Sequence, residues 1–112
     1  MSSSPLAELD AAKFAAVLHS RFQVGSTLSR AVDVALVEVS PTRRFGSSAP
    51  DAPAFESFSL LFEGPVSTPL TQGTYSFAHP QMGHFDLFIV PIGRQDQFIQ
   101  YQAVFNRTVN PA

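Results

Sequence analysis

Histidine offers the widest range of chemistry in this 112-residue chain, which carries three: His19, His79 and His84. His79 and His84 flank the segment from Pro80 to Gly83, and Asp86 follows two residues later. A set of three such nitrogen and oxygen ligands can hold zinc. Five residues across a turn is not a specific ligand spacing, however, and no HExxH motif is present. We therefore predict no metal site and no cofactor, and expect His79 to hydrogen-bond the backbone of the turn.

General acid–base catalysis needs two titratable groups that converge in a pocket. The nine acidic residues are spread thinly, and only Glu63 and Asp86 are expected near apolar surroundings. An enzyme, either a hydrolase or an isomerase that uses His79 with Glu63 or Asp86, is thus a weaker hypothesis than the two binding functions described below. The chain has no cysteine, no GxSxG elbow and no glycine-rich phosphate loop. We predict that the protein is not an enzyme and assign no catalytic residue.

The low charge of the chain indicates a protein partner. Charged residues make up 14% of the sequence and the net charge is −2, against a typical charged content of about 25%. We expect a homo-oligomer or a permanent protein partner, with an ordinary soluble monomer as the alternative. Its one lysine and scattered arginines do not form the basic footprint that binds nucleic acid.

The sequence contains no apolar run long enough for membrane insertion, which takes about 20 residues. Its first residues, MSSSPLAELDAAKF, lack the basic and apolar regions of a signal peptide. We therefore expect a cytoplasmic protein, or one exported within an assembly without its own signal.

The elements that must position any site begin with a helix predicted over residues 4–20. Ser4 can cap it and Pro5 fits its first turn. Four apolar residues recur at helical spacing: Ala11, Phe14, Val17 and Leu18. We expect this stripe to pack on a sheet; the alternative is that it docks into a partner.

Residues 22–40 are predicted to form strands, of which Val32 to Val39 is rich in β-branched residues and is expected to be central. Residues 41–54 are rich in proline and serine, a composition typical of a long loop. This loop is either a disordered surface loop or an arm that becomes ordered on a partner, with Phe45 as its anchor.

Residues 55–107 are predicted to form antiparallel strands, because apolar and polar residues alternate between short turns. One face carries Phe58, Leu60 and Phe62, and the later strands repeat the pattern. The candidate structural turn residues are Gly64, Pro65, Gly73, His79, Pro80, Gly83, Pro91 and Gly93. The whole chain, residues 1–112, is thus predicted to be a single, mainly β domain. In it, an N-terminal helix packs on a small antiparallel barrel or sandwich of about six to seven strands.

The same segments resemble a small bacterial family that is known as a domain of unknown function. The resemblance rests on Gly64-Pro65, Leu70, Gln72 to Tyr75, His79-Pro80, Gly83, Leu87-Phe88, Val90-Pro91, Gly93 and Tyr101 to Asn106. It covers most of the chain except the loop from Thr42 to Ala54. Family members lie beside genes for phage-tail-like fibre proteins of the tail-collar type. The resemblance therefore implies a structural or assembly role with such a protein as partner, and it implies no catalytic residue.

Two binding hypotheses follow. The first is a non-enzymatic structural or adaptor protein that binds another protein by adding strands at a sheet edge. The segment from Gln95 to Gln102 is its candidate edge, because Asp96 is the only charge there to block pairing. The candidate interface residues are Phe45, Phe98, Gln100 and Gln102. The alternative is a small-ligand binding module with a barrel cavity lined by Tyr75, Phe77, Phe85 and Tyr101.

Overall fold

The computed structural model describes residues 10–26, 29–46 and 54–109. One short helix is followed by seven strands: α1 (Ala11–Ala15), β1 (Arg21–Ser26), β2 (Ser29–Val39), β3 (Arg43–Gly46), β4 (Ala54–Pro65), β5 (Gly73–His79), β6 (Gly83–Gln95) and β7 (Phe98–Val109). Within the described ranges, no helix has the length and apolar character needed to cross a bilayer.

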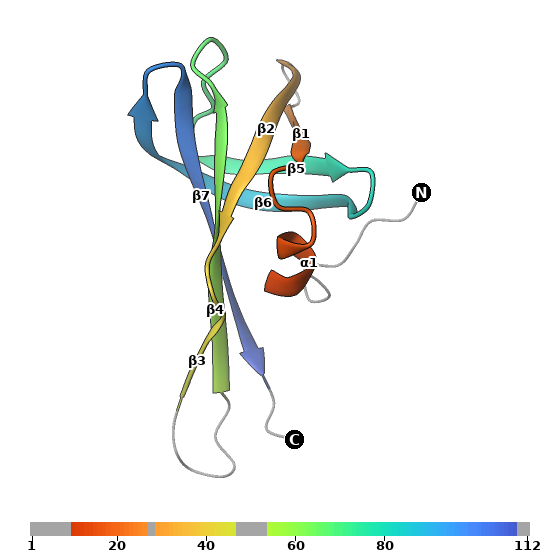
Figure 1. The fold of residues 1–112 in the computed structure, drawn as a ribbon, viewed down its shortest axis with the longest axis vertical. Helices are drawn as coiled ribbons and strands as arrows, with labels where there is room; N and C mark the ends of the chain where they lie inside the picture. Colours follow the sequence, from red (N-terminus) through yellow and green to blue (C-terminus); the bar gives the residue numbers. More distant parts are fainter. Residues whose placement is uncertain (1–9, 27–28, 47–53, 110–112) are drawn as a thin grey trace.

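Six of the strands close into an antiparallel barrel (Figure 1). The order around the barrel is β2, β1, β5, β6, β7 and β4, and β4 returns to β2 through the pairs from Ala35 with Glu63 to Val39 with Leu60. The predicted mainly β fold is confirmed, and the structure selects the barrel over the sandwich. The predicted central strand, now β2, pairs with β1 from Ser29 to Ala35 and with β4 from Ala35 to Val39.

Strand β4 is longer than the barrel wall and continues beyond it within the same seven-stranded sheet. Its first residues, Ala54 to Ser57, pair with β3, while β7 accompanies β4 from end to end. Figure 1 shows β3, β4 and β7 extending together beyond the barrel. We call this extension, made of β3, residues 54–59 and residues 103–109, the arm. The predicted loop over residues 41–54 is therefore partly wrong, because Arg43 to Gly46 form a strand on the edge of β4; residues 47–53 lie outside the described part.

Helix α1 is much shorter than predicted. The expected cap at Ser4 and Pro5 lies outside the described residues, and Asp10 caps the observed helix by accepting a hydrogen bond from the Lys13 amide at 2.8 Å. After Ala15 the chain continues in turns to His19, which adopts a left-handed φ of 71° and donates its N–H to the Leu36 carbonyl on β2, at 2.7 Å. Phe14 and Val17 are buried as predicted, whereas Leu18 is exposed.

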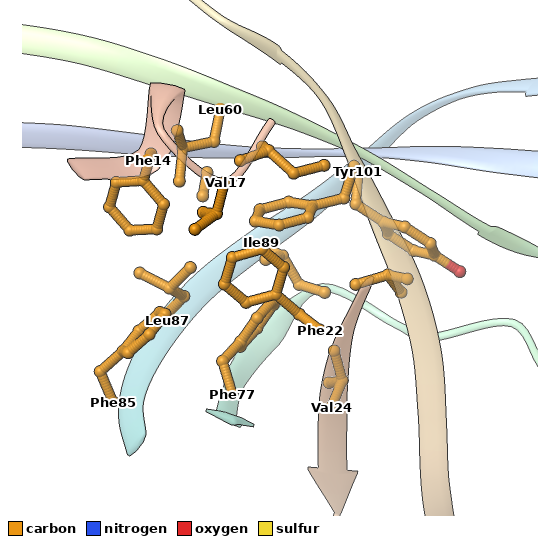
Figure 2. Packing of buried hydrophobic residues seen from close by; sticks show 14 of the residues in the cluster. Phe14, Val17, Phe22, Val24, Leu60, Phe77, Phe85, Leu87, Ile89 and Tyr101 are labelled. Carbon is orange, nitrogen blue, oxygen red and sulfur yellow. The ribbon is translucent and has the colours of Figure 1, made fainter. Parts of the chain in front are cut away.

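Aromatic side chains fill the barrel (Figure 2). The buried core consists of Phe14, Val17, Phe22, Val24, Val32, Val34, Leu36, Phe58, Leu60, Phe62, Phe77, Phe85, Leu87, Ile89, Tyr101 and Ala103. Helix α1 contributes Phe14, whose ring lies 5.8 Å from that of Phe85 and 5.5 Å from that of Phe105. Burial of a side chain of this size contributes about 1.5–3 kcal/mol to the free energy of folding. This contribution holds even a short helix against the core of the barrel.

One of the predicted turns is not a turn, and another begins at its second predicted residue. Strand β4 runs through Gly64 and ends at Pro65, whose carbonyl accepts the turn hydrogen bond of the Thr68 amide at 3.3 Å. Strand β6 instead continues past Pro91 and Gly93 to Gln95, with a β-bulge between these two residues. A bulge adds one residue to a strand without ending it. From the sequence alone, a proline and a glycine at such a place look like a turn.

The other predicted turn residues do bound strands. Gly73 begins β5, His79 ends it, and Pro80 lies in the turn before β6. Gly83 closes this turn with a φ of 80°, a conformation that glycine adopts without strain.

Gly64 is instead required by close packing. A Cβ atom at this position would lie 3.1 Å from Val34 Cγ1 and 3.2 Å from Tyr101 Cε2. We predict that Gly64→Ala lowers the free energy of unfolding by about 1–3 kcal/mol, because both neighbours are buried and must shift. Denaturant unfolding measures this. In the control Gly25→Ala the nearest atom is 3.9 Å away, so an equal loss in both variants would contradict the packing explanation.

Candidate functional site

His79 lies at the end of β5, where it joins three parts of the chain. Its Nδ1 accepts a hydrogen bond from the Gln81 amide at 3.0 Å, and its Nε2 lies 2.9 Å from Ser20 Oγ. Since Nδ1 is an acceptor, the proton of the neutral ring is on Nε2, which donates to Ser20. The Ser20 hydroxyl in turn donates to the Val17 carbonyl. The ring also packs on Phe22 with a centroid distance of 4.5 Å.

This arrangement is that of a structural histidine. Burial lowers the pKa of His79, since desolvation disfavours the charged imidazolium. Both ring nitrogens are used within the fold, and the bond from Gln81 confirms the predicted contact with the turn backbone. Asp86, the proposed acidic partner, instead accepts from Ser76 Oγ at 3.2 Å. In the described ranges, no three histidine or acidic side chains gather as a metal site would require.

The predicted interface edge is not an edge. Gln100 pairs with Glu63 on β4 and with Gly93 on β6, and Gln102 pairs with Leu61 and Val90. Both glutamines therefore lie in the closed wall of the barrel, where backbone groups already have partners. The exposed side chain of Phe98 lies at the start of the same paired stretch. Phe45 lies on β3, but its side chain is outside the described part.

The open edge lies further along β7. Strand β6 pairs with β7 only from Phe98 to Gln102, whereas β4 pairs with it through Val109. Among the described residues, no strand therefore pairs with the second side of β7 beyond Gln102.

The direction of the backbone groups on this edge follows from one pair. Pro91 lies opposite Tyr101 and has no N–H, so the hydrogen bonds of this pair come from flanking residues, and the Gln102 backbone faces β6. Because these directions alternate along a strand, the N–H and C=O groups of Val104 and Asn106 face the open edge.

An exposed apolar side chain lies on this edge. Val104 is 55% exposed and points to the outer face of the arm. The last β6–β7 pair joins Val90 to Gln102. Phe88 lies two residues before Val90 on β6, and its side chain is 52% exposed. Val104 lies two residues after Gln102 on β7. The corner where β6 leaves β7 thus combines unpaired backbone with two apolar side chains. We call Phe88, Val104 and Asn106 the β7 corner. The sequence does not reveal it, because the exposure of these residues depends on where β6 turns away from β7.

The architecture is that of a closed six-stranded antiparallel barrel with a projecting three-stranded arm. The chain belongs to the family of domains of unknown function DUF6916, whose sequence profile matches residues 9–105. No curated protein and no solved structure matches the chain. The membership confirms the resemblance to a small family of unknown function.

We predict that His79 makes the fold pH-dependent. Its pKa is lowered in the folded state, so the unfolded chain binds the proton more readily. The contribution of His79 to stability is therefore fully present above the unfolded value of 6.5 and is lost as the pH falls below it. Protonation would also turn Nδ1 into a donor that faces the Gln81 amide.

Denaturant unfolding at about pH 7.5 and about pH 5 tests this, since stability follows the difference in bound protons. In His79→Gln, the loss of stability on acidification should be smaller than in the unaltered protein. The exposed His84 gives the control His84→Gln. If His84→Gln, rather than His79→Gln, reduced the pH dependence, the assignment would be wrong.

Proposed function

We propose that this domain is a non-enzymatic structural or adaptor protein that binds another protein chain by strand addition at the β7 corner. The observation that carries the proposal is the unpaired edge of β7 beyond Gln102. An exposed strand edge is a template for another strand, and natural proteins usually block it with charge, proline or a bulge. Val104 and Asn106 supply none of these.

The other edge of the arm has a different composition. Strand β3 is only four residues long and carries the pair Arg43-Arg44 in its sequence. Short length and positive charge are two of the devices that protect edges from pairing. The greater length of the stretch of β7 without a β6 partner, from Ala103 to Val109, favours β7 as the binding edge.

The assembly that we propose is phage-tail-like or fibrous, with a tail-collar-like fibre protein as partner. This part rests on the motif from Gly64-Pro65 to Tyr101–Asn106 and on the gene neighbourhood of the family it resembles. The protein would act in the cytoplasm, or be exported as part of that assembly. A homo-oligomer built through the same edge is the simplest form of such an assembly.

The alternative, a ligand cavity inside the barrel, finds less support. Phe77, Phe85 and Tyr101, three of the four residues expected to line it, are buried in the core. The Phe77 ring lies 6.1 Å from that of Phe85 and 5.2 Å from that of Phe62. The Tyr101 hydroxyl is occupied by the Leu70 amide at 2.9 Å. These contacts place aromatic rings where a ligand would have to lie.

Val104→Lys tests the proposal. The substitution places a charge at the open edge, which opposes strand addition, while the exposed position leaves the core intact. Light scattering gives the mass of the protein alone and co-expressed with the product of the adjacent gene. We expect an oligomer or a stoichiometric complex, weakened at least about tenfold by Val104→Lys.

The matched control is Gln23→Lys. Gln23 is also exposed, but it lies on β1 between Asp33 and Ala78, where the backbone is paired on both sides. A monomer that ignores its neighbour, or a complex that tolerates Val104→Lys as well as Gln23→Lys, would overturn the proposal. Circular dichroism of each variant separates lost binding from lost folding.

A further inference from the structure

Pro65 ends the pairing that closes the barrel. The β2–β4 ladder begins at Ala35 with Glu63, and two positions further in the same register Asp33 would lie opposite Pro65. The Leu36 amide donates to Ser20 on the β1 side, so by alternation the backbone of Asp33 faces β4. Pro65 has no N–H to donate to the Asp33 carbonyl, and the ladder stops there.

A groove lies where the two strands separate. It has a volume of about 680 Å³ and is lined by Ala31, Val32, Asp33, Pro65, Thr68, Pro69 and Leu70. One wall is the edge of β2, and the other is the apolar segment after β4. Figure 1 shows β2 and β4 diverging at this end of the barrel, with the β4–β5 connection beside them.

Hydrogen bonds hold the second wall in place. The Leu70 amide donates to the Tyr101 hydroxyl at 2.9 Å, and the Tyr75 hydroxyl donates to the Thr71 carbonyl at 2.9 Å. The Val66 amide donates to the Gln97 carbonyl at 3.1 Å. In Figure 2 the Tyr101 hydroxyl points away from the core cluster that holds its ring. The wall is thus held in one conformation by the core. This lowers the entropic cost of ordering the groove when a ligand binds.

We infer that this groove binds an extended peptide segment of a protein partner, as a strand added to β2. The inference rests on the proposed function and gives the partner its chemistry. Backbone groups of β2 would pair with the peptide, and Pro65, Pro69 and Leu70 would contact its inward-facing side chains. Asp33, the acidic residue lining the groove, points outward and favours a basic side chain opposite it. The matching pattern is apolar–basic–apolar.

The probe for this inference is the peptide acetyl-Thr-Val-Arg-Val-Thr-amide, titrated into ¹⁵N-labelled protein. We expect amide shifts confined to residues 31–33, 66–68 and 70, since Pro65 and Pro69 have no N–H. Replacing the arginine of the peptide by glutamate should raise the dissociation constant about twofold to fivefold, the range expected for one exposed ion pair. Asp33→Lys should reverse the preference between the two peptides. Glu38→Lys, on the same strand but outside the groove, should leave it unchanged.

A bulky substitution in the groove tests where the peptide binds. Thr68→Trp should fill the groove and abolish the shifts, whereas Ser67→Trp, at the exposed neighbouring position, should not. An absence of shifts, shifts elsewhere, or binding that Thr68→Trp leaves intact would overturn the inference. These readings are independent of the β7 corner: if Val104→Lys breaks the assembly while the groove stays empty, the proposed function stands and only this inference fails.

Discussion

The pairing of β4 with β7 is the interaction on which the rest of the structure depends. Twelve residue pairs join the two strands, from Ala54 with Val109 to Pro65 with Phe98. The barrel uses only part of this length, since β2 contacts Leu60 to Glu63 and β6 contacts Phe98 to Gln102. What remains must project beyond the barrel, and this surplus length generates the arm and its open edge.

Prolines lie where the pairing of these strands ends or shifts its register. Pro65 stops the β2–β4 ladder and opens a groove at one end of the barrel. Pro91 removes one donor from β6, and the bulge that follows lets the strand continue to Gln95. A proline is tolerated at such positions because it costs only the one hydrogen bond that its missing N–H would have made. Both candidate binding surfaces are strand edges that have no partner strand among the described residues.

The local part of this fold could be predicted from the sequence. Alternation places Phe58, Leu60 and Phe62 on one face because successive side chains of a strand point in opposite directions, and the structure buries all three. The pairing partners could not be predicted, since they depend on contacts between distant segments. For that reason Gln100 and Gln102 looked like edge residues and are in the barrel wall. Strand β3 was hidden in a segment of loop composition, because only its four residues, Arg43 to Gly46, pair with β4.

Residue-resolved amide hydrogen exchange on the monomer tests most directly whether β7 has an open edge. The Val104 and Asn106 amides face away from β4 and have no β6 neighbour, while those of Ala103 and Phe105 face β4. We expect fast exchange at Val104 and Asn106 and slow exchange at Ala103, Phe105 and Gln102. Equal protection of all five amides in a chain of monomeric mass would contradict it, because the edge on which the proposed binding depends would already be covered.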